Sequence, residues 1–403
     1  MSATLRQKHA ASERTPHPID KSIKPKEANM GPSENGTMQA ARVHGAGGQF
    51  EMDSIERPRI KRPTDVIINV KASGVVPNLR NVMSNYGERA YLTVPELPAI
   101  YGLDTAGVIA EIGSGVTGLT VGDRVYLNPG RSCGTCHACR CGEPINCSAY
   151  TFQGYFGFGP ASRQIYREYP YGGFCEFATG PANGLIKLPD TISFEQAARF
   201  GYLGTAYSGL RKADVRAGRT VLISGASGTL GLGAVQIARA MGATRILCVA
   251  RNADLLERVR LLDPQRIRTF SYGTGDLATW ARDETDGIGV DAVLDAIGPG
   301  ASHQVTLDCI AALRRGGKLV EVGAMSDPMP VNLHQMMCAQ VSLIGSLWFS
   351  VAEGQELAAM ADAGTLDLSI FEHHRFPLER VNQALELAEK RIGGFMNVVI
   401  TQE

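Results

Sequence analysis

The spacing of apolar and polar positions divides this chain into two parts. Between about 41 and 185, short apolar runs rich in β-branched residues alternate with glycine-containing turns, a pattern typical of strands. It predicts strands at 66–70 and 105–110, and a turn into another strand at 121–125. After about 200, short apolar runs alternate with longer segments of helical periodicity. We therefore expect a β-rich domain followed by an α/β domain.

The second part carries the clearest fold prediction. Strands are predicted at 220–225, 245–250, 267–272, 290–297, 318–323 and 341–346, and helices at 231–241, 254–261 and 302–314. Alternation of strand and helix predicts a doubly wound parallel sheet with helices on both faces. The C-terminal segment returns to mixed structure, with a helix at 379–390 and a closing strand at 396–400.

Composition limits the classes of function. A chain of 403 residues exceeds one ordinary core, so we expect two domains. Its 40 basic and 40 acidic residues cancel, which argues against nucleic acid as a partner. No run approaches the roughly 18 apolar residues of a membrane span. We expect a cytoplasmic protein that binds a small molecule.

Residues 1–40 differ from the rest of the chain. They are polar, contain prolines at 16, 18, 25 and 32, and precede the first aromatic residue, Phe50. Such a segment cannot bury enough apolar surface to offset its ordering entropy, so we expect a disordered extension. It lacks the apolar centre of a secretory signal, and its acidic residues argue against a transit peptide.

A glycine loop follows the first predicted strand of the α/β part. It comprises Gly225, Ala226, Ser227, Gly228, Thr229, Leu230 and Gly231, and it opens an apolar-faced helix. Glycines allow a tight turn and let backbone N–H groups approach a pyrophosphate at a helix N-terminus. This context predicts a dinucleotide site, although the spacing is one residue longer than G-x-G-x-x-G.

The residue after the next strand bears on the choice of nucleotide. NAD enzymes usually place an acidic residue there for the ribose 2′-hydroxyl, whereas this chain has Arg251. A guanidinium suits a 2′-phosphate through charge-assisted hydrogen bonds. We therefore expect NADPH rather than NADH, the alternative being a solvent-facing arginine.

Four cysteines have the spacing of a structural zinc site: Cys133, Cys136, Cys139 and Cys147. Tetrahedral Zn²⁺ takes four thiolates, and C-x-x-C turns aim two sulfurs at one ion. The alternative is free or disulfide-bonded cysteines, but this is not a small secreted scaffold. We expect one structural Zn²⁺ per protomer.

Further segments complete a familiar order of motifs. They are PAIYGLDTAG at 98–107, GSGVTGLTVGDRV at 113–125 and GGFCEF at 172–177. With the cysteines and the glycine loop, residues 41–403 resemble the medium-chain dehydrogenase/reductase superfamily, which includes zinc alcohol dehydrogenases and quinone or enoyl reductases. The resemblance implies a Rossmann domain inserted into a β-rich, GroES-like catalytic domain.

The resemblance also implies domain limits and an assembly. The catalytic domain would comprise 41–201 and 346–403, with a zinc lobe at 130–150, and the dinucleotide-binding domain 202–345. The active site would lie in the cleft between these domains. Members of the superfamily are mostly homodimers or homotetramers. Residues 317–346 of this chain correspond to the segment through which their subunits often pair sheets edge to edge.

The sequence departs from zinc alcohol dehydrogenases at the catalytic metal. Their three usual ligand positions correspond to Val76, Leu103 and Gly201, none of which can bind Zn²⁺. Asp104 stands where the family has a glutamate near the zinc, and a single carboxylate does not make a zinc site. We therefore expect chemistry without a catalytic zinc.

The resemblance also suggests roles for residues near the cleft. The segment from Tyr91 to Pro98 looks like that of enoyl reductases in which a tyrosine donates a proton, so Tyr91 is a candidate donor; a tyrosine packed in a loop is the alternative. Asn78 occupies the place of a proton-relay hydroxyl, or is an ordinary turn residue. Thr205 and Leu230 would pack against the nicotinamide, and the backbone around Ala296, Gly298 and Gly323 would line its carboxamide pocket.

An aromatic-rich segment bears on the substrate. Eight aromatic residues fall between the cysteines and Gly172: Tyr150, Phe152, Tyr155, Phe156, Phe158, Tyr166, Tyr169 and Tyr171. They suit either an apolar or aromatic ligand or the anchoring of a long loop.

Three functions follow as hypotheses. The first is an NADPH-dependent reductase of an activated C=C bond, in an enone, enal or quinone. The second is a zinc-independent alcohol dehydrogenase or carbonyl reductase. The third is a non-redox or non-catalytic scaffold that binds a nucleotide.

Overall fold

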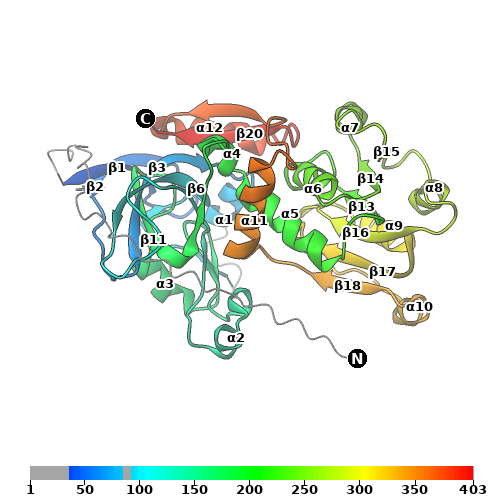
Figure 1. The fold of residues 1–403 in the computed structure, drawn as a ribbon, viewed down its shortest axis with the longest axis horizontal. Coiled ribbons are helices and arrows are strands. Elements are labelled where there is room, and N and C mark those ends of the chain that lie inside the picture. Colours follow the sequence, from blue (N-terminus) through cyan, green and yellow to red (C-terminus); the bar gives the residue numbers. More distant parts are fainter. Residues whose placement is uncertain (1–35, 85–91, 403) are drawn as a thin grey trace, which may run out of the picture. The chain divides into compact units, whose positions relative to one another are not determined.

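The computed structural model describes residues 36–84 and 92–402, and the chain from Thr37 onward forms one compact unit. Its centre is two sheets, one of seven strands and one of six. Two smaller sheets of three and four strands adjoin the first. Figure 1 shows the elements in chain order from blue to red.

The seven-stranded sheet is built from both ends of the chain. Its order is β12-β7-β6-β3-β20-β19, with β11 also paired to β3. The strands are β3 (Asp65–Gly74), β6 (Asp104–Ile112), β7 (Arg124–Leu127), β11 (Phe177–Pro181), β12 (Leu185–Lys187), β19 (Glu372–Phe376) and β20 (Met396–Thr401). The C-terminal strand β20 pairs antiparallel with β3, so the part of the chain that forms β13–β18, between β12 and β19 of this sheet, is an insertion.

The two small sheets and several short helices complete this β-rich part. The strands are β1 (Thr37–Val43), β2 (Phe50–Glu56), β4 (Leu92–Thr93), β5 (Ala99–Ile100), β8 (Gly130–Arg131), β9 (Thr151–Phe152) and β10 (Gly157–Phe158). The helices are α1 (Leu79–Ser84), α2 (His137–Arg140), α3 (Ser162–Glu168), α4 (Phe194–Ala197), α11 (Val351–Asp362) and α12 (Val381–Glu389), with 3-10 turns η1 (Pro144–Asn146), η2 (Ala182–Gly184) and η3 (Leu378–Arg380).

The inserted sheet is parallel, in the order β15-β14-β13-β16-β17-β18. Its strands are β13 (Thr220–Ser224), β14 (Arg245–Ala250), β15 (Ile267–Ser271), β16 (Val290–Asp295), β17 (Leu313–Glu321) and β18 (Ser342–Gly345). The helices are α5 (Phe200–Lys212), α6 (Thr229–Ala240), α7 (Ala253–Arg260), α8 (Leu277–Asp283), α9 (Gln304–Ala311) and α10 (Leu333–Ala339).

Both faces of this sheet are covered, as Figure 1 shows. Val221 and Ile223 belong to the main core cluster, which contains residues of α5 and α6. Leu222 points to the opposite face and joins a second cluster with residues of α8 and α9. Because successive strand residues face opposite sides, continuous apolar runs are what such a strand requires. The predicted fold class, a Rossmann sheet with a β-rich domain, is confirmed.

Some predicted elements differ from the observed ones. Strand β1 begins at Thr37, before the predicted end of the extension at residue 40, because Met38 and Ala40 are buried and the strand pairs with β2. Helices α5, α8, α10 and α11 were not predicted. Strand β17 begins at Leu313 rather than 318, and a register shift in its pairing with β16 separates the two parts. The predicted domain junction at 201/202 lies within α5, and the domain limits stay a prediction.

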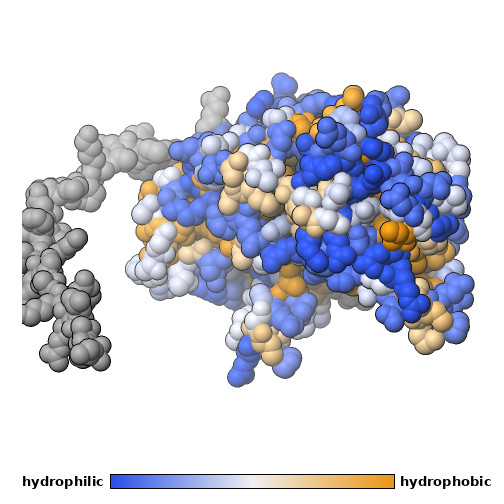
Figure 2. Space-filling model, turned by 45° about the vertical axis from the view of Figure 1, so that its right-hand side comes forward, coloured by the Kyte–Doolittle hydropathy of each residue, from blue (hydrophilic) through white to orange (hydrophobic). Residues whose placement is uncertain are grey.

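The surface agrees with the balanced composition. Figure 2 shows a mainly hydrophilic face with hydrophobic residues in small separate groups. In the part of the chain that the structure describes, no helix has the length and apolar character needed to cross a membrane.

Candidate functional site

The glycine loop connects β13 to α6 at the carboxyl edge of the parallel sheet. Gly225 has a φ of 67°, in the left-handed region that favours glycine. A Cβ on Gly231 would lie 2.1 Å from the Gly225 carbonyl oxygen, so the loop folds closely onto the first turn of the helix. Gly228 precedes α6 and supplies no side-chain cap. The first N–H groups of α6 therefore fit an anionic group such as a pyrophosphate.

The other predicted nucleotide residues lie along the same edge. Arg251 follows β14 directly and is exposed. Ala296 follows β16, and its carbonyl would lie 3.1 Å from a Cβ on Gly225. Gly323 follows β17, and its carbonyl would lie 3.7 Å from a Cβ on Gly298. The topology thus brings the ends of β13, β14, β16 and β17 together, as parallel strands require.

A pocket adjoins the start of α6. The residues that line it come from the end of β3, the start of β6, the starts of α5 and α6, and the segment from α12 into β20. They are Gly74, Val75, Val76, Pro77, Asp104, Ala198, Arg199, Tyr202, Thr229, Ala388, Arg391, Gly393, Met396, Asn397 and Val398. Thr229 of the glycine loop and Asp104 therefore share one cavity.

Asp104 is the buried carboxyl group of this pocket, with 1% of its surface exposed. Its Oδ1 accepts hydrogen bonds from the Tyr126 hydroxyl at 2.6 Å and from the Gly201 N–H at 2.9 Å. Burial raises the pKa of Asp104 to about 7, although both hydrogen bonds and the nearby Arg199 favour the charged form. A group with this pKa exchanges a proton near neutrality.

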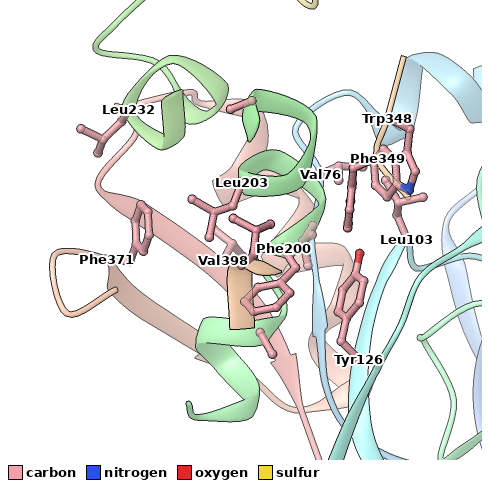
Figure 3. Packing of buried hydrophobic residues seen from close by; sticks show 14 of the residues in the cluster. Val76, Leu103, Tyr126, Phe200, Leu203, Leu232, Trp348, Phe349, Phe371 and Val398 are labelled. Carbon is pink, nitrogen blue, oxygen red and sulfur yellow. The ribbon is translucent and has the colours of Figure 1, made fainter. Parts of the chain in front are cut away.

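The three positions that correspond to family zinc ligands lie close to Asp104: Val76 lines the same pocket, Leu103 precedes Asp104 in the chain, and Gly201 donates its N–H to it. Val76 and Leu103 are buried, and a Cβ on Gly201 would lie 2.3 Å from Asp104 Oδ1 and 2.8 Å from the tip of Trp348. Figure 3 shows Val76, Leu103 and Trp348 near Tyr126 and Phe200 in this cluster. A side chain at position 201 thus meets atoms that already occupy the space.

The candidate donors, Asn78 and Tyr91, and the predicted nicotinamide contacts, Thr205 and Leu230, lie in different surroundings. Asn78 is half-buried and hydrogen-bonded to Tyr155, whose burial raises the pKa of its phenol. Thr205 lies one turn along α5 from Gly201, and its hydroxyl donates to the Gly201 carbonyl at 2.7 Å. Leu230 is in the first turn of α6, half-buried. Tyr91 falls outside the described residues, so its role stays a prediction.

Most of the aromatic segment is packed in the interior. Tyr150, Phe152 and Tyr155 are at most 8% exposed, and Tyr169 donates a hydrogen bond to Asp65. Loop anchoring therefore accounts for much of this segment, and Tyr155 is the member hydrogen-bonded to a candidate site residue.

The predicted zinc lobe brings its four cysteines together. One sulfur from each of Cys133, Cys136, Cys139 and Cys147 lies within 4.8 Å of the others. The Cys136–Cys139 and Cys133–Cys147 sulfur pairs are each 3.5 Å apart. Zn–S bonds of about 2.3 Å in a tetrahedron place sulfurs about 3.8 Å apart, so the cluster fits a structural Zn²⁺. Backbone N–H groups of Thr135 and Cys136 lower the pKa of Cys133, which favours the thiolate.

The sequence analysis did not identify three residues at the site. Arg199 and Arg391 both line the pocket. Trp348 has a φ of 57°, rare for a bulky residue, and its indole N–H donates to Asn128 at 2.9 Å. Each is a single residue without a motif. Arg199 lies two positions before Gly201, a position that the sequence analysis did consider, but it was not itself singled out.

Asp104 makes stability depend on pH. Its folded pKa, about 7, exceeds the ordinary 3.8, so between these values the native state binds a proton that the unfolded state does not. Stability from this group is present below about pH 4 and is lost as pH rises through 7. We expect Asp104→Asn, which keeps the Oδ1 acceptor, to gain a few kcal/mol relative to wild type between pH 4 and 8, because one pKa unit equals about 1.4 kcal/mol. Guanidinium unfolding across this range measures it; parallel curves for the two proteins would contradict it.

Together these features define a class of protein. A Rossmann sheet with a glycine loop at its carboxyl edge, joined to a β-rich domain with a four-cysteine zinc lobe, is the architecture of an NAD(P)-dependent oxidoreductase of the alcohol dehydrogenase type. Residues 62–190 match the family "Alcohol dehydrogenase GroES-like domain", and residues 229–363 match "Zinc-binding dehydrogenase". The chain belongs to the zinc-type alcohol dehydrogenase family of medium-chain dehydrogenases/reductases.

Known relatives agree with this assignment. The chain is 30% identical to an alcohol dehydrogenase of Geobacillus stearothermophilus over 87% of its length and 95% of the relative's. It is also 30% identical to an acryloyl-coenzyme A reductase of Metallosphaera sedula, over 76% of its length and 84% of the relative's. A solved NAD-dependent alcohol dehydrogenase, 27% identical, superposes with a TM-score of 0.75 over 91% of this chain and all of that one.

Proposed function

We propose that the protein is an NADPH-dependent reductase that works without a catalytic zinc on an activated C=C bond of an apolar or aromatic enone, enal or quinone. The observation that carries the proposal is the replacement of the metal ligands. Val76 and Leu103 offer no ligand atoms, Gly201 has no room for a side chain, and Asp104 is hydrogen-bonded to Tyr126 and Gly201. This donor set does not fit a catalytic Zn²⁺.

Without a Lewis acid, side chains must supply hydrogen bonds and the proton. The bound nicotinamide would supply hydride to the β-carbon of the substrate. The negative charge that develops on the carbonyl oxygen needs a hydrogen-bond donor, and the α-carbon needs one proton. Asp104, with its pKa of about 7, suits storage of that proton at neutral pH. Asn78 and Tyr155 provide polar groups beside it, and Tyr91 remains the candidate donor to the substrate.

The preference for NADPH is proposed from Arg251. It is exposed at the end of β14, where a 2′-phosphate would be accessible to its guanidinium. We expect Arg251→Ala to raise KM for NADPH at least ten-fold and to leave KM for NADH within two-fold. Arg260→Ala, at the other end of α7, is the control and should change neither. Equal effects on both nucleotides would count against a 2′-phosphate contact.

The reaction itself is tested by product analysis. With NADPH and an apolar α,β-unsaturated aldehyde, the saturated aldehyde is the expected product. The alternative function is a zinc-independent alcohol dehydrogenase or carbonyl reductase, which the similarity to alcohol dehydrogenases favours. It would yield the allylic alcohol instead. Failure to bind NADPH at micromolar concentration would favour a scaffold role and overturn both.

We also propose a homodimer or homotetramer. Strand β18 ends the parallel sheet, with one edge paired to β17. Apolar side chains are exposed around this edge, on α10, on β18 itself and after it: Leu333, Met337, Leu343 and Leu347. A second copy paired at this edge would cover them. Sedimentation of the purified protein measures the assembly.

A further inference from the structure

Arg199 is a buried arginine whose hydrogen-bond acceptors are backbone carbonyls rather than carboxylates. It is 2% exposed and precedes α5. Its guanidinium donates to the carbonyls of Met396 at 2.9 Å, Gly394 at 2.7 Å and Thr229 at 3.0 Å. Burial lowers the pKa of Arg199 to about 10, so the group stays charged at neutral pH. A buried charge of this kind costs several kcal/mol and calls for an explanation.

The carbonyls belong to two segments that meet at the glycine loop. Thr229 is the first residue of α6, while Gly394 and Met396 lead into β20. Gly394 also donates its N–H to the Ser227 carbonyl at 2.8 Å, and a Cβ on it would lie 2.3 Å from the Gly228 carbonyl oxygen. The C-terminal segment is thus in backbone contact with the glycine loop, and the Arg199 guanidinium donates hydrogen bonds to carbonyls of both segments.

The bond to Thr229 has a consequence for the nucleotide site. In a trans peptide the carbonyl and the following N–H lie in one plane and point in opposite directions. By holding the Thr229 carbonyl, Arg199 sets the orientation of the Leu230 N–H in the first turn of α6. That turn is where a pyrophosphate would accept hydrogen bonds. Arg199 itself lines the adjoining pocket, and its Nε has no hydrogen-bond partner among the described residues.

We propose that Arg199 is a positioning residue for the nicotinamide dinucleotide: by clamping Thr229 and Gly394 it holds the glycine loop in the conformation that binds the pyrophosphate. The pyrophosphate is common to NADPH and NADH, so the role does not depend on Arg251. It rests on dinucleotide binding and is independent of whether the substrate is reduced at C=C or C=O.

The chain contains a matched control in Arg131. It is 4% exposed, burial lowers its pKa to about 10, and its guanidinium also donates to backbone carbonyls, those of Asn128 and Gly130. It belongs to β8, in a different sheet from the glycine loop, and does not line the pocket. Removing it should cost comparable stability without touching the nucleotide site.

The test compares Arg199→Met, Arg199→Lys and Arg131→Met with wild type, by fluorescence titration with NADPH and with NADH and by thermal unfolding. We expect Arg199→Met to raise both Kd values at least ten-fold and by similar factors, and Arg131→Met to leave both within two-fold while its Tm falls comparably. A lysine at position 199 keeps the positive charge, but its single ammonium group cannot reproduce the planar guanidinium that donates to three carbonyls. Arg199→Lys should therefore not restore nucleotide binding. If Arg199→Met fails to fold, the Kd values of Arg199→Lys test the proposal instead. Wild-type affinity in the Arg199 variants, full rescue by lysine, or equal weakening by Arg131→Met would each overturn the proposal.

Discussion

Replacing Cys147 with serine is expected to abolish zinc binding and to lower Tm by roughly 10 °C. Cys147 is the buried member of the cluster, and its sulfur lies within hydrogen-bond reach of the Cys133 and Ala149 N–H groups. Structural zinc sites contribute folding free energy directly, about 10 kcal/mol or more in small domains. Losing part of this folding free energy from one lobe would lower Tm by roughly 10 °C. Metal analysis and calorimetry measure both effects.

Cys141→Ser is the matched control for this experiment. Cys141 lies in the same lobe and is exposed, but it is not one of the four clustered cysteines. The variant should keep zinc and Tm. Stoichiometric zinc in Cys147→Ser would contradict the assignment of the lobe. Wild-type protein should carry one zinc per protomer, and a ratio near two would overturn the zinc-free chemistry proposed above.

The second large effect is expected for Gly231→Ala in the glycine loop. Helix propensity alone predicts that alanine stabilises α6 by up to about 1 kcal/mol. The added Cβ, however, would lie 2.1 Å from the Gly225 carbonyl oxygen and 2.8 Å from Ala226 Cα, which are backbone atoms that cannot rotate away. The loop must therefore shift. We expect Kd for NADPH to rise at least ten-fold and Tm to fall by several degrees, measured by fluorescence titration and calorimetry.

Gly233→Ala separates steric displacement from any general effect of alanine in this helix. Gly233 is two residues further along α6, and the nearest atom to its added Cβ is Leu203 Cδ2 at 3.4 Å, an ordinary contact. This variant should bind NADPH like wild type and be equally or slightly more stable. If both variants behave alike, the close approach of Gly231 to Gly225 is not what shapes the loop.

Local patterns explain why much of the fold could be predicted. Strands such as 220–224 are short apolar runs because both of their faces are buried, and the helix after the glycine loop has a long apolar periodicity. Both signals lie in consecutive residues. Helices α8 and α10 were missed because each is only seven residues long, too short for a clear period. Helix α5 is longer, but its three glycines weaken the helix signal. Strand β1 begins before the predicted limit because only its pairing with β2 makes Met38 and Ala40 core residues.

The candidate site was predictable where its members are close in sequence. The four cysteines and the glycine loop each fall in one short segment, so their spacing in the sequence is enough to predict that they lie together. The missing zinc ligands were read from the resemblance. The sequence did not indicate that Asp104 accepts hydrogen bonds from Tyr126 and Gly201, because these three residues are far apart along the chain.

Periodicity and local motifs in the sequence determined the doubly wound parallel sheet and the four-cysteine zinc site, and the resemblance that the motifs carry implied the GroES-like domain and an NAD(P)-dependent oxidoreductase family. Tertiary structure alone decided that Asp104 has a pKa near 7, that Trp348 reaches Gly201, and that Arg199 joins the glycine loop to the C-terminal strand. The physical reason is that burial, desolvation and steric exclusion arise between residues remote in sequence, and they exist only once the chain has brought those residues together.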